Sequence, residues 1–182
     1  MKRVLVKSVY DAFEYVMQHS YCFGQADMAE RKDTYAVISI QDTHTQGFGF
    51  QFCENQFCKG VLTLYFDDII REVDGAVLFT DEMADQIIAF VLAHRSVETL
   101  LVHCYGGQSR SRAVGAFAVE MLGGNSERYF ETGSPNHNCT AQMIQLCSAF
   151  FLEKRRKCVI FSALSSKNSL LGNVFPAGCL RF

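Results

Sequence analysis

The chain has 182 residues, of which 49% are hydrophobic and 20% charged, and its formal net charge is −2 at pH 7. This length fits one domain with a substantial core, and the near-neutral charge argues against intrinsic disorder and against general nucleic-acid binding. We therefore expect one domain over residues 1–161 and an apolar C-terminal tail over 162–182 that docks on the domain or on a partner subunit.

Apolar runs and helix-start signals alternate along the chain. Short apolar runs predict strands at 3–6, 35–40, 61–66 and 99–102. Periodic apolar positions and capping signals predict helices at 8–18, 80–93, 113–122 and 139–154. In the first of these helices, Val9, Ala12, Phe13 and Val16 are expected on one face. This alternation predicts an α/β fold with a central, mostly parallel sheet flanked by helices.

Several features point to the cytoplasm and away from membranes and metals. The amino terminus begins like a signal peptide, but Lys7 and Asp11 interrupt the apolar region too early. No run approaches the roughly 18 apolar residues that would cross a membrane. The eight cysteines are expected to be free thiols, because a chain this rich in core residues does not need disulfides. Cys53 and Cys58 have no matching Cys/His pair for zinc, so we expect no metal.

The most informative segment lies between the last predicted strand and the helix that follows it. Cys104 stands six residues before Arg110, with Gly106 and Gly107 between them. Backbone N–H groups at a helix start favour an anion and can cradle a phosphoryl group. The glycines permit close backbone approach, the planar guanidinium can hold two phosphate oxygens, and a thiolate is a good nucleophile. The segment is therefore predicted to bind a phosphate group and to attack it.

Neighbouring residues support this chemistry. Ser111 can donate its hydroxyl to the sulfur and ease the departure of sulfur in a second step. His103, at the strand end, is expected to orient the loop rather than to act as a base. The residues expected to bind substrate are Tyr105, Gly106, Gly107, Gln108 and Ser109.

The run from His103 to Ser111, His-Cys-x-x-Gly-x-x-Arg-Ser, resembles the signature loop of the cysteine-based protein tyrosine and dual-specificity phosphatases. Ser134-Pro135-Asn136-His137, followed by Gln145-Leu146, is similar to a Pro-Asn…Gln-Leu segment that follows the signature helix in the compact dual-specificity enzymes. The resemblance covers roughly residues 35–150. It implies a three-layer phosphatase architecture and a cysteinyl-phosphate mechanism that uses neither a metal nor a cofactor.

The resemblance also implies a general acid on the loop after the strand at 61–66, which would protonate the leaving oxygen. In this chain Leu64 to Ile69 ends that strand. Asp68 is the first candidate, Asp67 is its immediate alternative, and Asp42 is the third.

These features predict a phosphomonoester hydrolase that acts on phosphotyrosine or another phosphoprotein. The five residues between Cys104 and Arg110 are uncharged, which disfavours highly anionic lipids and RNA 5′ ends. Two alternatives stay open: a thiol enzyme resembling rhodanese or arsenate reductase, and a phosphate-binding module without turnover. The Phe-rich segment 48–57 is expected to pack on the core rather than to form a wall beside the substrate. The sequence favours neither a monomer nor an oligomer.

Overall fold

Strands and helices alternate along the chain in the structure, a computed structural model that describes residues 1–20, 33–45, 47–131, 134–136 and 139. The elements are β1 (Arg3–Lys7), α1 (Val9–Ser20), β2 (Tyr35–Gln41), β3 (Cys58–Tyr65), α3 (Asp81–Ala93), β4 (Thr99–His103), α4 (Arg110–Met121) and α5 (Arg128–Glu131). All four predicted strands and the first three predicted helices are therefore present. The predicted tail at 162–182, and the predicted helix beyond Cys139, lie outside the described residues.

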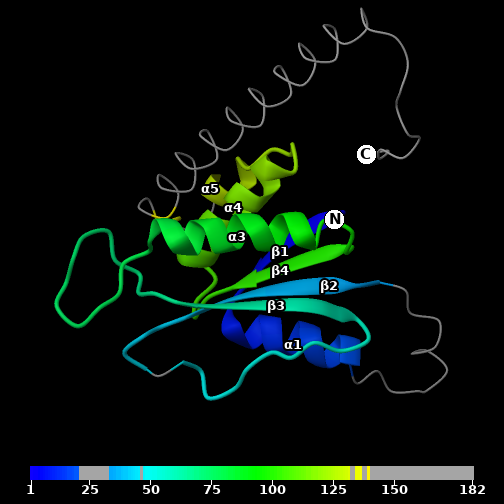
Figure 1. The fold of residues 1–182 in the computed structure, drawn as a ribbon, viewed down its shortest axis with the longest axis horizontal. Helices are drawn as coiled ribbons and strands as arrows, with labels where there is room; N and C mark the ends of the chain where they lie inside the picture. The colour runs from blue at the N-terminus through cyan, green and yellow to red at the C-terminus, as the bar shows by residue number, and fades with distance from the viewer. Residues whose placement is uncertain (21–32, 46, 132–133, 137–138, 140–182) are drawn as a thin grey trace, which may run out of the picture. The chain divides into compact units, whose positions relative to one another are not determined.

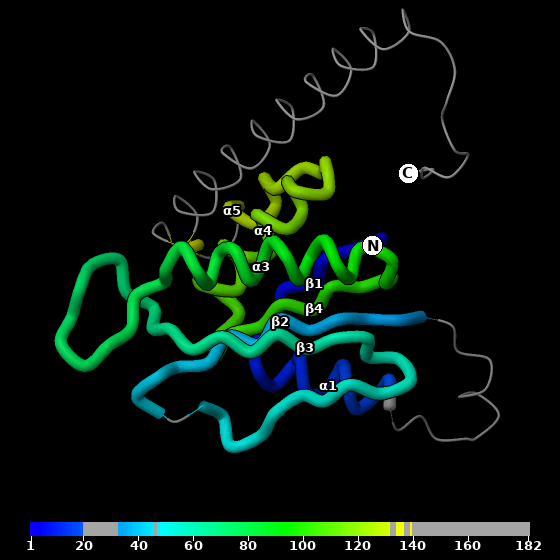
Figure 2. Tube along the Cα trace, in the orientation of Figure 1, coloured from blue at the N-terminus to red at the C-terminus, as the bar shows by residue number. Residues whose placement is uncertain are grey.

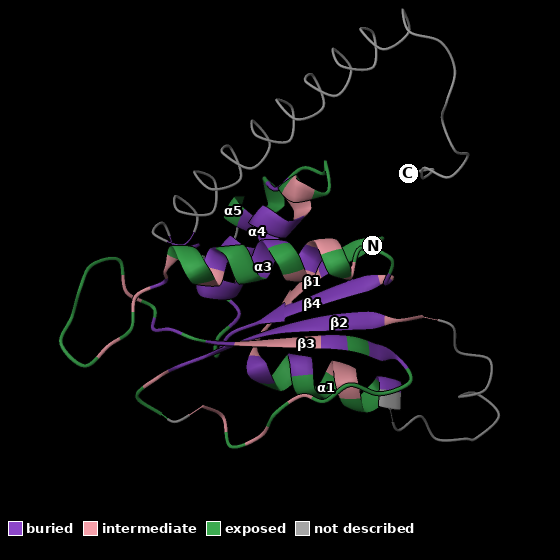
Figure 3. Ribbon diagram, viewed as in Figure 1, coloured by how far each residue is buried: buried purple, intermediate pink, exposed green. Residues whose placement is uncertain are grey.

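The four described strands form one sheet in the order β1-β4-β2-β3, and every neighbouring pair is parallel. Helix α1 covers one face of this sheet, while α3, α4 and α5 lie on the other face (Figure 1; Figure 2). The predicted α/β fold, a parallel sheet flanked by helices in three layers, is confirmed. Every residue of β2 and β4 is buried (Figure 3), which explains why these strands appear in the sequence as continuous apolar runs.

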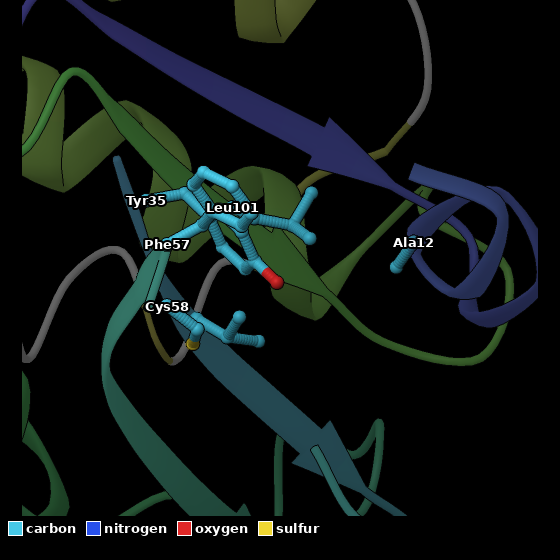
Figure 4. Close-up of a cluster of buried hydrophobic side chains, with 6 residues drawn as sticks. Ala12, Tyr35, Phe57, Cys58 and Leu101 are labelled. Atoms are coloured by element: carbon cyan, nitrogen blue, oxygen red, sulfur yellow. The ribbon is translucent and has the colours of Figure 1, made fainter. Parts of the chain in front are cut away.

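A core cluster fills the space between α1 and the sheet. Its buried members are Ala12, Tyr35, Val37, Phe57, Cys58 and Leu101 (Figure 4). Side chains alternate between the two faces of a strand, so His103, two residues after Leu101, is directed to the same face as Leu101. The end of β4 therefore emerges on the α1 side, immediately before Cys104.

Local hydrogen bonds fix the starts of two helices as the sequence predicts. The Ser8 hydroxyl accepts from the Asp11 backbone N–H at 3.1 Å and donates to the Asp11 carboxylate at 2.8 Å. Thr80 is the N-cap of α3, and its side chain accepts from the Met83 N–H at 3.4 Å. Such caps satisfy backbone donors that have no partner within the helix.

One detail of the prediction is wrong. Phe13 was expected on the buried face of α1, but it is 46% exposed, because Val9 and Ala12 occupy the line of contact with the sheet. Helix α4 contains the predicted apolar run as far as Met121 and begins before it, at Arg110, because the polar residues of its first turn carry no apolar periodicity.

Helix α4 lies very close to the sheet. A Cβ atom at Gly115 would stand 2.4 Å from the Cγ2 atom of Val6 in β1, so a larger residue would force the Val6 side chain or the helix to move. The close packing fixes the start of α4 relative to the strand ends. None of the helices in the described ranges is long and apolar enough to cross a membrane.

Candidate active site

The carboxyl ends of the parallel strands meet at one edge of the sheet, where ligands bind in folds of this kind. Asp42 directly follows β2, the pair Asp67-Asp68 follows β3 after one intervening residue, and Cys104 directly follows β4. The structure thus brings together the thiol and the three carboxylates that the sequence singled out.

The thiol and the guanidinium are both buried at this edge. Cys104 is 2% exposed and Arg110 is 4% exposed. The Cys104 Sγ atom lies 3.1 Å from the Ser111 Oγ atom. A hydroxyl at this distance can donate to a thiolate and stabilise its charge.

One edge of the Arg110 guanidinium is held in place, and another donor is left unused. Arg110 Nη1 donates to the Phe66 carbonyl at 2.8 Å and pairs with Asp42 Oδ1 at 2.7 Å. Its Nε is buried and has no hydrogen-bond partner within the described part of the chain. A buried N–H without a partner costs free energy, so Nε is a donor suited to an anion that enters the loop.

The start of α4 provides further donors. Ser109 occupies the N-cap position but makes no side-chain cap hydrogen bond. Its hydroxyl instead donates to Asp68 Oδ1 at 2.7 Å. The first amides of α4 therefore have no side-chain cap, and the positive end of the helix dipole can act on an anion.

Gly107 allows the loop to pack against the junction of β1 and α1. Its φ angle is +70°, and a Cβ atom there would stand 2.7 Å from the backbone carbon of Lys7 and the backbone nitrogen of Ser8. The Val9 N–H fixes the same junction by donating to the Tyr105 carbonyl at 3.1 Å. At Gly106, by contrast, a Cβ atom would meet nothing within 4 Å.

Gly107→Ala is expected to destabilise the fold by about 2 kcal/mol, because alanine at positive φ is strained and its Cβ meets backbone atoms. A loss of this size lowers the Tm by roughly 4–8 °C in a chain of this length. Gly106→Ala is the matched control, with an expected change within about 0.5 kcal/mol. Equal melting temperatures for the two variants, measured by thermal unfolding, would contradict the close packing at Gly107.

Asp68 is exposed but bound to the loop. Its Oδ1 accepts from Ser109 and, at 2.7 Å, from the Asn136 side-chain amide. Asn136 is buried, and its Oδ1 accepts from the Cys139 N–H at 3.1 Å. In the sequence Asn136 stands out only as part of the Pro-Asn motif, and in the structure its side chain contacts Asp68, the first candidate for the general acid.

Asp67 is buried and surrounded by donors. It accepts from the Val77 N–H at 2.8 Å, from His44 Nδ1 at 2.9 Å and from both the N–H and the hydroxyl of Thr43. Burial alone would raise the pKa of this carboxyl, but the hydrogen bonds lower it well below its usual range. A carboxylate held ionised in this way has no proton to donate near neutral pH.

Asp42, His44 and Asp67 also present possible metal-ligand atoms within 4.8 Å of one another. These atoms already have partners, since Asp42 pairs with Arg110 and Asp67 accepts the four hydrogen bonds above. The cluster is accounted for by contacts within the protein.

His103 is fully buried among aromatic rings beneath the loop. Its ring lies 5.0 Å from that of Phe52 and 5.8 Å from that of Phe48, between centroids. Neither ring nitrogen has a hydrogen-bond partner within the described ranges. Burial lowers the pKa of His103 to about 4, so the imidazole is neutral at pH 7.

This burial predicts a loss of stability in acid. The unfolded chain binds a proton at His103 below its ordinary pKa of about 6.5, whereas the folded protein does not until about pH 4. The free energy of unfolding should therefore fall by about 2 kcal/mol from this group between pH 7 and pH 5. In His103→Leu this part of the fall should be absent. Denaturant titrations of both proteins at pH 7 and at pH 5 measure the free energy of unfolding that is compared. An identical fall in the free energy of unfolding in the two proteins would contradict the burial of a neutral imidazole.

Cys139 joins the site from a distant part of the sequence. It is fully buried. Burial raises the pKa of its thiol, and the charge of Asp68 adds to that effect, which indicates an inert thiol near the site. The cysteines in the described ranges, Cys53, Cys58, Cys104 and Cys139, are free thiols.

The Phe-rich segment divides into two parts. Phe57 is buried in the core cluster, and Phe52 packs against that cluster, as predicted. Phe48 and Phe50 instead line a groove with a volume of about 230 Å³ beside the loop, so the predicted core packing is wrong for these two residues. This surface, here called the aromatic groove, is lined by Val9, Tyr10, Thr45, Gly47, Phe48, Phe50 and Tyr105.

No protein-family model and no curated protein matches this sequence. Among solved structures, the chain is similar to a human tyrosine phosphatase-like serine/threonine/tyrosine-interacting protein, with 19% identity over 70% of this chain and 84% of that one and a TM-score of 0.45. It is similar to human DUSP28, with 19% identity over 82% and 94% of the two chains and a TM-score of 0.44. It is also similar to DUSP15, with 18% identity over 86% and 90% and a TM-score of 0.47. These similarities are of fold alone.

Proposed function

We propose that this chain is a cysteine-dependent phosphomonoester hydrolase that acts on phosphotyrosine or another phosphoprotein. The observation that carries the proposal is the arrangement around Cys104. A buried thiol lies 3.1 Å from the Ser111 hydroxyl, in a loop whose buried arginine has an Nε without a partner in the described part of the chain. Nucleophile, anion-binding donors and a hydroxyl to stabilise the sulfur are thus gathered at one helix start.

In the first step, the Cys104 thiolate attacks phosphorus. The S–P bond forms while the P–O bond to the leaving alcohol or phenol breaks, which leaves a cysteinyl-phosphate. Arg110 Nε and the first amides of α4 hold the non-bridging oxygens, where charge is stabilised in the transition state. Asp68 gives its proton to the leaving oxygen.

In the second step, water attacks the phosphorus of the intermediate. The O–P bond forms, the S–P bond breaks and inorganic phosphate is released, while Asp68 takes the proton from the water. Ser111 donates a hydrogen bond to the departing thiolate, which makes sulfur a better leaving group. The enzyme returns to its starting state.

The surroundings of the three aspartates support Asp68 as the acid. Asp67 is held ionised by its hydrogen bonds, and Asp42 is paired with Arg110 at 2.7 Å. Asp68 alone of the three is exposed to an incoming leaving group and is hydrogen-bonded to the loop through Ser109. Asp42 is better suited to positioning the guanidinium.

The positive charge of Arg110 and the helix-start amides supply the charge stabilisation for which other phosphate enzymes use metal ions. The proposed mechanism therefore requires neither a metal nor a cofactor at this site. A thiol nucleophile works only while it is reduced, which favours the cytoplasm as the place of action.

The proposal is tested on the wild-type chain with p-nitrophenyl phosphate. We expect turnover that vanadate inhibits, and a phosphoenzyme, trapped by acid quenching, that carries one phosphate per chain at most. Transfer of sulfur from thiosulfate to cyanide, or arsenate-dependent oxidation of thiols, would instead favour the rhodanese-like or reductase-like alternative. Tight binding of phosphopeptides without turnover would favour a phosphate-binding module.

A further inference from the structure

Three large apolar side chains of helix α1 are exposed rather than packed against the sheet. Tyr10 is 72% exposed, Phe13 46% and Met17 37%. Their spacing of three and four residues places them on one side of the helix, while Val9 and Ala12 are buried. Buried and exposed residues alternate along α1 (Figure 3). Exposed apolar side chains that gather in this way mark an interaction surface.

This apolar stripe of α1 continues into the aromatic groove. The Phe13 and Phe50 rings lie 5.5 Å apart between centroids, and the Tyr10 and Tyr105 rings lie 6.4 Å apart. Phe48 closes the other side, 6.0 Å from Tyr105. The residues that line the groove carry no charge, so the groove is suited to an apolar occupant rather than to an ionic one.

The groove also adjoins the loop that carries the nucleophile. Tyr105 is the residue after Cys104, is 54% exposed, and contributes its ring to the groove. Its backbone carbonyl accepts from the N–H of Val9, another residue of the groove. A substrate whose phosphate lies over Cys104 therefore brings its neighbouring residues to this groove.

We propose that the aromatic groove selects substrates by binding one large apolar side chain, aromatic or branched aliphatic, that stands near the phosphorylated residue of a protein. This inference rests on the proposed hydrolase function. The groove volume of about 230 Å³ suits one such side chain, and burial of that side chain adds binding free energy to the charge-based recognition of phosphate.

A phosphoprotein fits this surface better than a membrane does. Asp11 and Glu14 are exposed on the same helix as Tyr10 and Phe13. Helices that bind membrane surfaces instead carry Lys and Arg on their polar side, because cellular membranes present anionic lipids. The two acidic side chains would be repelled by such a surface.

The test compares phosphotyrosine peptides that differ at one position. A small polar peptide receives phenylalanine or alanine at each position near the phosphotyrosine in turn, and kcat/KM is measured for each peptide. The wild type should prefer the best phenylalanine peptide over its alanine partner roughly tenfold. In Tyr10→Ala this preference should fall close to one. Tyr10 is so exposed that its removal leaves the core intact.

Phe130→Ala is the matched control. Phe130 is 43% exposed and belongs to α5, on the face of the sheet opposite to α1 (Figure 1). The control should retain the roughly tenfold preference, because it removes an exposed aromatic ring that has no part in the groove.

Several outcomes would overturn the inference. Equal kcat/KM values across the wild-type series, together with turnover of p-nitrophenyl phosphate, would overturn the groove proposal while leaving the hydrolase function standing. Absence of turnover with every peptide and with p-nitrophenyl phosphate would overturn both. Sedimentation with phosphatidylserine vesicles, or self-association, that Tyr10→Ala abolishes without any peptide preference would assign the surface to a membrane or to a second copy of the chain.

Discussion

Cys104→Ser is expected to abolish hydrolysis of p-nitrophenyl phosphate, with a loss of roughly 10⁶-fold in kcat. A serine hydroxyl at this position lacks an adjacent general base. The Ser111 hydroxyl, 3.1 Å from the thiol, is itself neutral and unsuited to accept the proton. Binding of inorganic phosphate should survive, because Arg110 and the start of α4 are unchanged.

Initial rates of hydrolysis measure the loss of turnover in Cys104→Ser, and isothermal titration calorimetry measures its binding of inorganic phosphate. Cys53→Ser is the control, since Cys53 is an exposed free thiol outside the loop, and it should keep wild-type turnover. Turnover of Cys104→Ser at the wild-type rate would remove the nucleophile from the mechanism. Loss of phosphate binding along with turnover would show that the thiol supports the loop rather than the chemistry.

That the candidate site residues lie close together could be predicted from the sequence, because each of them follows the end of a strand. The strands at Tyr35–Gln41 and Thr99–His103 are buried on both faces, so they appear as continuous apolar runs. Parallel strands place their carboxyl ends at one edge of the sheet. That rule alone brings Asp42, Asp68 and Cys104 to the same edge, before any side-chain contact is known.

The partners of these residues could not be predicted in the same way. Whether a loop carboxylate turns toward Arg110, as Asp42 does, or toward backbone N–H groups, as Asp67 does, depends on backbone angles that periodicity does not encode. Asn136 and Cys139 reach the site from beyond α5. The Pro-Asn motif includes Asn136 but specifies no contact, and Cys139 lies outside that motif.

The aromatic groove shows a further limit. Phe48, Phe50, Phe52 and Phe57 are chemically equivalent in the sequence, yet only Phe57 is buried in the core. Their segment is irregular, so no period of two or of 3.6 residues assigns each ring to a face. The assignment of Phe13 failed for a related reason. A residue beside the line of contact on a helix is buried or exposed according to what packs above it, and here Phe50 only partly covers Phe13.

Asp68→Asn is expected to lower kcat by roughly 10²–10⁴-fold for substrates with poor leaving groups, such as phosphotyrosine and phenyl phosphate. An amide cannot protonate the departing oxygen. It can still accept from Ser109 and Asn136, which lie 2.7 Å from Asp68 Oδ1, so the loop should keep its structure. The loss should be smaller for p-nitrophenyl phosphate, because p-nitrophenolate leaves without needing a proton.

The dependence on the leaving group separates a general acid from a structural residue. Asp67→Asn is the matched control, because it changes the neighbouring carboxylate, whose hydrogen bonds to Thr43, His44 and Val77 hold the loop. It should lower the melting temperature and reduce the rates for both leaving groups by the same factor. If Asp68→Asn behaved like this control, the carboxylate would only hold the loop, and the proton would have to come from Asp42. Asp42→Asn would then reproduce the leaving-group dependence despite the ion pair between Asp42 and Arg110.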